Sequence, residues 1–365
     1  MLEIRRIIAF YDQLDLESES VALATVVHVE ESSYRRIGAR MLVSSSGHWT
    51  GGISGGCLEG DALQKAQRAI FNKTASVVTY DTMDDDANEI GVGLGCNGKI
   101  QVLFVPIDHE SDQNPIEKLR QLLYLKKPSI LFTIISSGSS PELLGNQMTQ
   151  SNLEGGLDFL DLGHNQLIHI SSAVFERKKS DVTYIQSDQH GKLKMLIEFV
   201  RPETQLVIVG DNYDVDAMVN IAKALGWNIK VVGKLSKIGK SVLNKIDNHI
   251  SLDQLDELIC HEYTAVILMS HDYKIDKHML AHFIEKAPTY LGILGPKKRF
   301  EKMRHELPNI EFDSLDFIYS PTGLELGAES PEEIALSVAA EIVAVFRDHH
   351  GGHLREKAGS IHPRD

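Results

Sequence analysis

The sequence predicts an α/β protein with an N-terminal mixed α+β domain followed by a C-terminal Rossmann-like domain with a parallel sheet. From Gln205 onward, short apolar strands alternate with helical segments, which is the pattern of βαβ units. Before Arg201, strands follow one another with glycine loops and a hairpin between them, which is typical of a mixed α+β domain. The expected boundaries are 1–200 for the first domain, 205–348 for the second and 349–365 for a tail.

Composition and charge limit the class of protein. The chain has 365 residues, 42% of them hydrophobic, and a net charge of −14, from 37 Lys plus Arg against 51 Asp plus Glu. This charge argues against nonspecific binding to nucleic acid or to anionic membranes. No apolar run approaches the roughly 18 residues of a membrane span. Three cysteines do not make a disulfide framework, so we expect a cytoplasmic protein with reduced thiols.

The elements of the first domain follow from the spacing of apolar residues. Helices are predicted, in chain order, over 4–16, 58–71 and 116–125. Strands are predicted over 21–29, 41–44, 75–80, 100–106 and 130–136, with a hairpin of 182–186 and 193–199. The stretch 137–163 has little periodicity and is expected to be rich in loops.

The second domain shows the same signals more clearly. Apolar strands are predicted over 206–209, 228–232, 265–268, 290–293 and 317–319. A helix is predicted over 215–225, and three more begin near Lys274, Lys297 and Pro331. The last start is the best defined, because Ser330 is placed as N-cap, Pro331 as first helical residue and Glu333 as the capping-box glutamate.

A glycine loop in the first domain is the strongest candidate for a ligand site. Residues 51–60 read GGISGGCLEG, so five of ten are glycine, and Cys57 stands where a helix begins. Unpaired N–H groups at a helix N-terminus favour anionic ligands, and Cys57 is a candidate reactive or ligating sulfur. A tight turn around a buried cysteine is the alternative.

The first Rossmann turn lacks the glycines of a dinucleotide fingerprint. From Gly210, the second glycine position holds Asn212 and the third holds Val215. A side chain at the second position obstructs the approach of a pyrophosphate to the backbone. Asp211, Asp214 and Asp216 add negative charge there. The pattern therefore predicts the fold but disfavours NAD(P).

Taken together, these motifs resemble a known family. The stretches concerned are 31–41, 52–59 and 93–98 in the first domain, and 270–272, 292–295, 320–328 and 330–335 in the second. They are similar to the xanthine dehydrogenase accessory factors, molybdenum-cofactor chaperones related to carbon monoxide dehydrogenase maturation proteins. One departure is local: this chain has Gly210-Asp211-Asn212-Tyr213 where the family usually carries Gly-Ala-Gly-His.

The resemblance implies a non-catalytic maturation factor. Such a protein binds the molybdenum cofactor (molybdopterin), protects it while it acquires its terminal sulfur, and inserts it into a xanthine-dehydrogenase-type enzyme. The implied partners are that molybdoenzyme and a cysteine desulfurase, and the implied assembly is a homodimer. Two rival functions remain: an NAD(P)-dependent oxidoreductase, and an accessory subunit that stays bound to a molybdenum hydroxylase.

The residues expected to hold the cofactor combine cations, loop backbone and sulfur, which suit a phosphorylated pterin dithiolene. They are Arg35, Arg36, Arg40, Ser54, Gly55, Gly56, Cys57, Glu59, Gly95, Cys96, Gly210, His271 and Asp272, with Cys57 and Cys96 as metal ligands and no catalytic residue. Several have plainer alternatives. The arginines are also compatible with solvated loop charges, Cys96 with a small core residue, and Asp272 with a helix cap. Cys260 is expected in the core, on a helical stretch.

Overall fold

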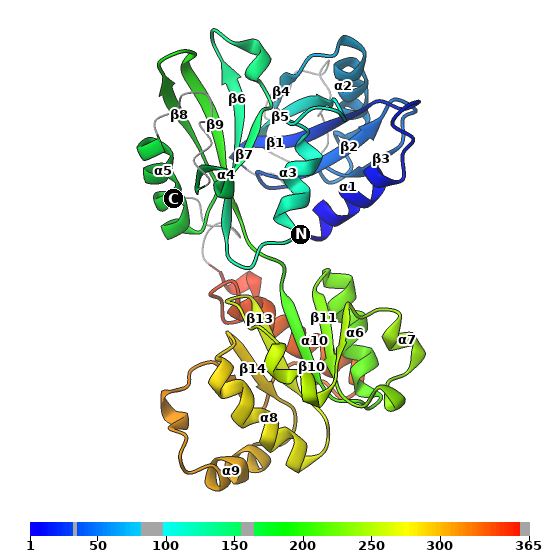
Figure 1. Cartoon of the computed structure of the whole chain (residues 1–365), viewed down its shortest axis with the longest axis vertical. Helices are drawn as coiled ribbons and strands as arrows, with labels where there is room; N and C mark the ends of the chain where they lie inside the picture. Colours follow the sequence, from blue (N-terminus) through cyan, green and yellow to red (C-terminus); the bar gives the residue numbers. More distant parts are fainter. Residues whose placement is uncertain (32–34, 82–97, 155–163, 358–365) are drawn as a thin grey trace. The chain divides into compact units, whose positions relative to one another are not determined.

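The structure is a computed structural model that describes residues 1–31, 35–81, 98–154 and 164–357 of the chain (Figure 1). The chain divides into two compact units, Met1–Pro202 and Glu203–Asp365, which we call unit 1 and unit 2. The division falls within the polar stretch 201–204. Each unit has its own sheets and its own buried core.

Unit 1 begins with a five-stranded sheet in the order β3-β2-β1-β5-β4, with antiparallel neighbours throughout. Its strands are β1 (Val21–Glu31), β2 (Arg40–Ser44), β3 (Trp49–Gly51), β4 (Ser76–Asp81) and β5 (Gly98–Ile107). Helix α2 (Glu59–Asn72) places Ala62, Ala66 and Ala69 against this sheet, because these residues repeat at helical spacing on one face.

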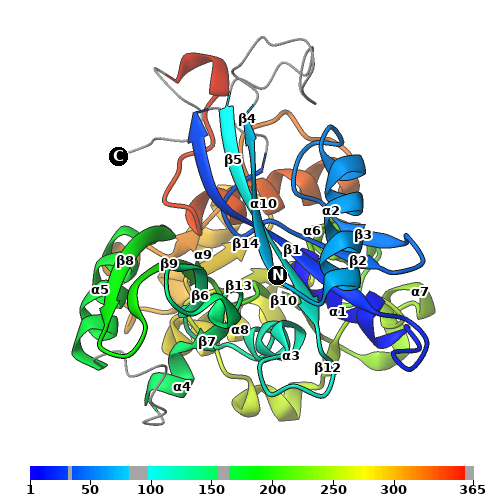
Figure 2. The same ribbon diagram turned by 90° about the horizontal axis from the view of Figure 1, so that it is seen from above.

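A second antiparallel sheet in unit 1 has the order β7-β6-β9-β8. Its strands are β6 (Ser129–Ser137), β7 (Gln147–Thr149), β8 (Asp181–Ser187) and β9 (Gly191–Val200). Helix α5 (His164–Arg177) lies along it in both ribbon views (Figures 1 and 2) and buries Leu167 and Val174. A short helix, α4 (Gln150–Glu154), follows β7.

Two further helices pack against both of these sheets. Helices α1 (Leu2–Asp12) and α3 (Pro115–Leu122) share one apolar cluster with Leu42 of β2 and Leu131 of β6. Because β2 and β6 belong to different sheets, this cluster makes unit 1 a single packed body.

Unit 2 contains a parallel sheet of six strands in the order β12-β11-β10-β13-β14-β15. The strands are β10 (Gln205–Val209), β11 (Asn228–Val232), β12 (Asn248–Ile250), β13 (Thr264–Leu268), β14 (Tyr290–Ile293) and β15 (Ile318–Tyr319). The helices are α6 (Asp214–Leu225), α7 (Lys240–Leu243), α8 (Tyr273–Lys286), α9 (Lys297–Glu306) and α10 (Pro331–Val345). The strand order reverses between β10 and β13, which is where ligands bind in open α/β sheets.

The predicted fold class is confirmed, including the parallel sheet and the capping box of Ser330 and Glu333. Some elements were not predicted: α5, β12, β3 and β7. Cys260 was placed on a helix, but it lies beyond the 3₁₀ turn Leu252–Glu257; it does pack against the core of unit 2. Other 3₁₀ turns are Pro141–Leu143, Leu235–Lys237, Phe312–Ser314 and Leu354–Glu356. None of the helices in the described part combines the length and apolar character of a membrane-spanning helix.

Candidate functional site

The glycine loop of unit 1 links the edge strand β3 to α2. Gly51 ends β3 with a φ of 81°, and a Cβ there would collide with the carbonyl of Arg40. Gly56 also has a positive φ, of 113°, but its surroundings are open. Glycine is therefore required at Gly51 by close backbone packing and at Gly56 by backbone conformation.

The N–H groups of this loop are occupied by side chains of the loop itself. Glu59 Oε1 accepts hydrogen bonds from the N–H groups of Ile53 (3.2 Å) and Ser54 (2.8 Å). Glu59 Oε2 accepts one from the Ser54 hydroxyl at 2.5 Å. The Ser54 hydroxyl oxygen in turn accepts from the N–H groups of Cys57 (3.1 Å) and Leu58 (3.0 Å). The carboxylate of Glu59 thus sits where an anionic ligand was expected.

Hydrogen bonding also determines the charge of Glu59. Burial raises the pKa of its carboxyl group, but hydrogen bonds from the Ser54 hydroxyl and from loop N–H groups outweigh this effect, so the pKa is lowered. The prediction that the N–H groups of the loop are unpaired was wrong, because Glu59 and Ser54, which were predicted to bind the cofactor, accept hydrogen bonds from them. What the loop exposes is the thiol of Cys57.

Arg35 is brought beside the loop. A Cβ on Gly52 would lie 3.5 Å from Arg35 Nη2 and 3.1 Å from Glu59 Oε1, so both charged groups border this glycine. Arg35 Nη1 also pairs with Glu3 at 3.0 Å. Arg36 is exposed. The loop therefore combines an exposed thiol with the nearby guanidinium group of Arg35.

Arg40 has a different environment from the one expected. It begins β2, and its side chain is 3% exposed. Its Nη1 donates to Glu198 Oε1 at 2.9 Å and its Nη2 to Glu198 Oε2 at 2.5 Å, a bidentate pair between β2 and β9. The alternative of a solvated loop charge is wrong for Arg40, because its side chain is buried in a pair with a residue 158 positions away. Its contact with a cofactor stays a prediction.

The second glycine loop cannot be placed beside the first, because Gly95 and Cys96 lie outside the described residues. Among the residues that the structure describes, no three His, Cys, Asp or Glu side chains gather as a metal-binding group. Cys260 packs in the core of unit 2, where burial raises the pKa of its thiol to about 11. Cys57 is therefore the exposed thiol of the described cysteines.

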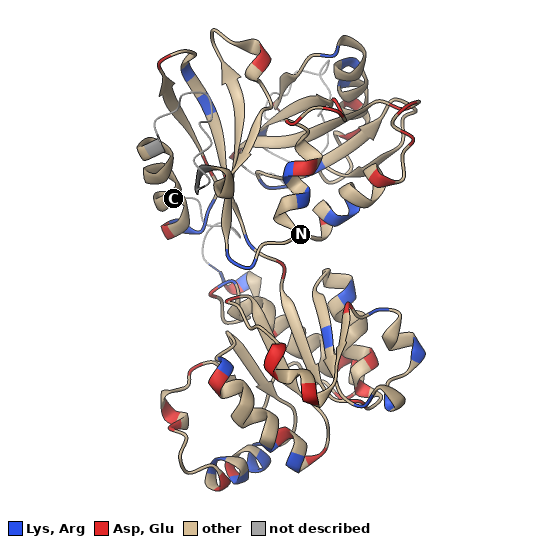
Figure 3. Cartoon of the chain, viewed as in Figure 1, with Lys and Arg blue, Asp and Glu red and all other residues tan. Residues whose placement is uncertain are grey.

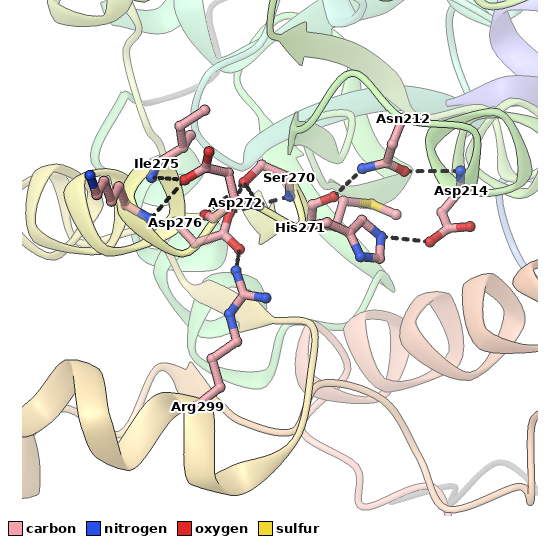
Figure 4. Close-up of polar contacts among 10 residues, drawn as sticks. Asn212, Asp214, Ser270, His271, Asp272, Ile275, Asp276 and Arg299 are labelled. Carbon is pink, nitrogen blue, oxygen red and sulfur yellow. Dashed lines mark hydrogen bonds and ion pairs between the residues drawn. The ribbon is translucent and has the colours of Figure 1, made fainter.

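In unit 2, the predicted residue Gly210 follows β10, and the predicted residues His271 and Asp272 lie in the turn after β13, whose end is paired with that of β10. Figure 4 shows His271 and Asp272 with their hydrogen-bond partners. A Cβ on Gly210 would lie 2.9 Å from the carbonyl oxygen of Met269, so this glycine lets the two strand ends approach. The amide of Asn212 donates to that carbonyl at 2.6 Å and accepts from the N–H of Asp214 at 3.0 Å. The Asn212 side chain thus occupies the turn where a dinucleotide fingerprint has glycine.

His271 and Asp214 form a pair across this switch point (Figure 4). His271 has a φ of 60°, rare for a residue with a side chain, and its Nε2 lies 2.8 Å from Asp214 Oδ2. The other oxygen, Asp214 Oδ1, is buried and has no hydrogen-bond partner among the described residues. An unsatisfied buried carboxylate oxygen is unfavourable, so it marks a place where a donor is wanted.

Asp272, the next residue of the same turn, caps the helix that follows it. Asp272 Oδ1 accepts from the N–H groups of Lys274 (2.8 Å) and Ile275 (3.1 Å), which lowers the pKa of this carboxyl group and caps α8. The alternative role of Asp272 as a helix cap is thus present in the structure, while its contact with a cofactor stays a prediction.

Asp276 and Arg299 form a hydrogen-bonded chain with Ser270 of the turn between β13 and α8. The sequence analysis did not single out either residue. Asp276 is buried, accepts from the Ser270 hydroxyl at 2.5 Å and pairs with Arg299 Nη2 at 2.6 Å. Burial raises the pKa of Asp276, although Ser270 and Arg299 oppose this shift. Arg299 belongs to the basic group on α9 that Figure 3 shows in blue. The one feature of the sequence that could have pointed to Asp276 is its position as a carboxylate in the first turn of a helix, α8.

Comparison with known proteins identifies the family. Residues 206–342 match the XdhC Rossmann domain, and residues 16–81 match the XdhC and CoxI family. A relative from Bacillus subtilis (strain 168), described as a probable subunit of xanthine dehydrogenase, is 30% identical over 344 residues, covering 92% of this chain and 96% of the relative. The chain belongs to the XdhC and CoxI family.

Two other relatives of this XdhC-family chain add structural and functional context. The molybdenum cofactor insertion chaperone PaoD of Escherichia coli (strain K12) is 23% identical over 345 residues, covering 93% of this chain and 88% of PaoD. A crystal structure described as a xanthine dehydrogenase from Bacillus halodurans aligns with a TM-score of 0.71 and 27% identity, covering 96% of this chain and 97% of that one. The similarity to the XdhC family therefore extends through both units.

Proposed function

We propose that this protein is a molybdenum-cofactor chaperone that binds the cofactor and inserts it into a xanthine-dehydrogenase-type enzyme. Family membership carries this proposal, together with the functions that the names of two relatives state: one inserts molybdenum cofactor, and the other is a probable component of xanthine dehydrogenase. The protein acts as a non-catalytic maturation factor, and the cofactor is its cargo.

The glycine loop of unit 1 supports part of this assignment. A molybdenum–dithiolene centre accepts soft thiolate ligands, and Cys57 is exposed at the loop. Its phosphate requires cations; Arg35 borders the loop, and the exposed Arg36 follows it in the chain. The loop N–H groups fit less well, because Glu59 and Ser54 occupy them. We therefore assign cargo binding here to the Cys57 thiol and the two arginines, with Gly55 and Gly56 leaving the thiol accessible.

Finer features of the proposal rest on the sequence and on the family resemblance. They are cytoplasmic location, a homodimer, sulfuration of the bound cofactor with a cysteine desulfurase as partner, and a role for Gly95 and Cys96 as a second thiol loop. NAD(P) is disfavoured as a ligand, since Asn212 fills the first Rossmann turn and Asp214 adds negative charge beside it.

The test is cofactor retention by the intact protein. The protein is purified without oxygen from a molybdate-fed host, and bound molybdenum and pterin are quantified. We expect near-stoichiometric pterin in the wild type and at least about a tenfold loss in Cys57→Ser, which keeps size but removes the soft ligand. Cys260→Ser is the matched control, because Cys260 packs in the core of unit 2.

The alternatives give distinct results. Full retention by Cys57→Ser would remove Cys57 from the site. A wild-type protein that ignores pterin but binds NADH with micromolar affinity would replace the chaperone by the NAD(P)-dependent oxidoreductase. A protein that co-purifies permanently with its molybdoenzyme would instead be an accessory subunit.

A further inference from the structure

Helix α10 of unit 2 has an apolar face that no other element covers. After its first turn, the helix sequence PEEIALSVAAEIVAV is apolar on every side except at Ser337 and Glu341. Ser337 is buried, and Glu341 accepts hydrogen bonds from the Tyr290 hydroxyl and from the N–H of Gly323. A helix that is apolar all round is usually buried all round, so the outer face of α10 lacks the cover that its composition requires.

The outer face of α8 shows the contrast within the same unit. Helix α8 exposes Lys274, His278 and Glu285, as a solvated helix does. Within residues 334–345 of α10, the exposed side chains are instead Leu336 and Val343, at 51% and 40%. They lie on one side of the helix, with the partly buried Ala340 between them. We call these three residues of α10 the α10 stripe.

The two ends of the α10 stripe carry opposite charges. Glu332 is exposed in the first turn and precedes Ala340 by about two helical turns. Arg347 is exposed just past the end of the helix and follows Ala340 by about two turns. Leu336 and Val343 lie about one turn before and after Ala340. From either end, the order is therefore a charge, an apolar side chain, alanine, an apolar side chain and the opposite charge.

This order is complementary to itself. When a second α10 runs antiparallel about a two-fold axis at Ala340, Leu336 of each copy faces Val343 of the other. Glu332 of each copy then faces Arg347 of the other, so acid meets base at both ends. The small side chain of Ala340 lets the two helix axes approach to about 8–10 Å. An unrelated partner would not require the acid and the base to be equally far from the centre.

We propose that the α10 stripe is a self-association surface, through which two copies of this chain pair by antiparallel contact of their α10 helices. The homodimer belongs to the proposed function, and the inference rests on it for the number of copies; the pairing itself needs no cofactor. The apolar contact provides the free energy of association, and the charges at the rim fix the direction of the helices. Helix α6, which packs beside α10, adds area to the interface.

The test measures the dimerisation of the full chain by sedimentation velocity at micromolar concentrations. We expect a dimer that Leu336→Glu weakens at least about a hundredfold, because each copy would bury a carboxylate among apolar side chains. Leu252→Glu is the matched control, since Leu252 is 44% exposed and begins the 3₁₀ turn Leu252–Glu257, outside the α10 stripe. It should change dimerisation less than about twofold, while circular dichroism and thermal unfolding show that both variants fold.

Charge reversal tests the antiparallel order. Glu332→Arg and Arg347→Glu should each weaken dimerisation about three- to tenfold, because like charges then face each other at both ends of the helix pair. The two reversals together should restore it to within about twofold of wild type, since each pair forms again with its signs exchanged. Rescue of this kind requires that both charges belong to copies of the same chain.

A protein that stays monomeric would overturn the proposal, as would a dimer that Leu336→Glu leaves intact or a double reversal weaker than either single one. Failure of the proposed function gives a different pattern. A wild-type dimer that pairs through the α10 stripe but retains no molybdenum cofactor would keep this surface and remove the chaperone role. A monomer that retains the cofactor would do the opposite.

Discussion

In the loop before α2 and in the turn before α8, a carboxylate accepts hydrogen bonds from the free N–H groups, but the two sites differ in the neighbouring groups. In unit 1, Glu59 lies across the N–H groups of the glycine loop, and both of its oxygens are hydrogen-bonded. In unit 2, Asp272 takes the N–H groups at the start of α8, while Asp214 keeps one buried oxygen without a donor among the described residues. The first site therefore exposes a thiol, and the second contains a buried acceptor without a donor among the described residues. A helix N-terminus predicts an anion site only when no nearby carboxylate already fills it.

The largest expected effect is on stability, and it distinguishes the buried Arg40 from the partly exposed Arg35 of unit 1. Arg40→Met should lower the free energy of unfolding by about 3–5 kcal/mol, because it leaves the buried carboxylate of Glu198 without its partner. Urea denaturation measures this through Trp49, the tryptophan of unit 1, in a Trp227→Phe background.

Arg35→Met is the matched control, since its ion pair with Glu3 is 36% and 26% exposed; the expected loss is within about 1 kcal/mol. If Arg40→Met instead unfolds like wild type and loses bound cofactor, Arg40 belongs to the binding site and the contrast between these arginines fails.

A second experiment tests the carboxylates that fill the two sites. Glu59→Gln should lower the stability of unit 1 by about 1–3 kcal/mol, because a neutral amide cannot replace both oxygens. The pKa of Glu59 is lowered in the folded protein, so its contribution is present above the unfolded pKa and is lost as pH falls through the folded value. The stability difference between wild type and Glu59→Gln should therefore shrink in acid.

Asp276 in unit 2 should behave in the opposite way. Burial raises the pKa of Asp276, so its contribution is present below the unfolded pKa and is lost as pH rises through the folded value. Relative to Asp276→Asn, wild-type unit 2 should gain stability as pH falls, measured through Trp227 in a Trp49→Phe background. A shift of the same sign in both units would show that the two carboxylates are not held in contrasting environments.

The smallest expected effect concerns a glycine of the loop motif that is not needed for backbone geometry. Gly60 lies in the first turn of α2, and an added Cβ would meet nothing within 4 Å. Gly60→Ala should therefore stabilise unit 1 by about 0.5–1 kcal/mol in urea denaturation. Unchanged cofactor retention is expected. A stabilised protein that no longer retains cofactor would show that Gly60 is kept for the approach of the ligand.

The sequence predicted most elements of unit 2 because each buried strand is a continuous apolar run bounded by helical periodicity. It missed α5, whose buried Leu167 and Val174 are surrounded by polar residues and leave a weak apolar stripe. It also missed β12, which has three residues and begins with Asn248. Short edge elements are specified by their neighbours rather than by their own composition.

For the candidate sites, the sequence singled out loops and strand ends but not the contacts within them. Glycine spacing pointed to residues 51–60, and strand ends pointed to His271. Local patterns contain no signal that Glu59 folds back on the loop, that Glu198 buries Arg40, or that His271 meets Asp214 across 57 positions. Such pairs depend on tertiary placement, which apolar periodicity does not encode.

The pair of Arg40 and Glu198 also has a consequence for how the chain is made. The two residues are 158 positions apart, and β9 is the last strand of unit 1. A ribosome adding about 5–20 residues per second needs about 8 to 32 s to pass from one to the other. During that time Arg40 has no carboxylate to accompany it into the interior, so β2 stays hydrated. Unit 1 therefore completes the packing around Arg40 only after its final strand emerges, and a truncated nascent chain leaves Arg40 without its partner.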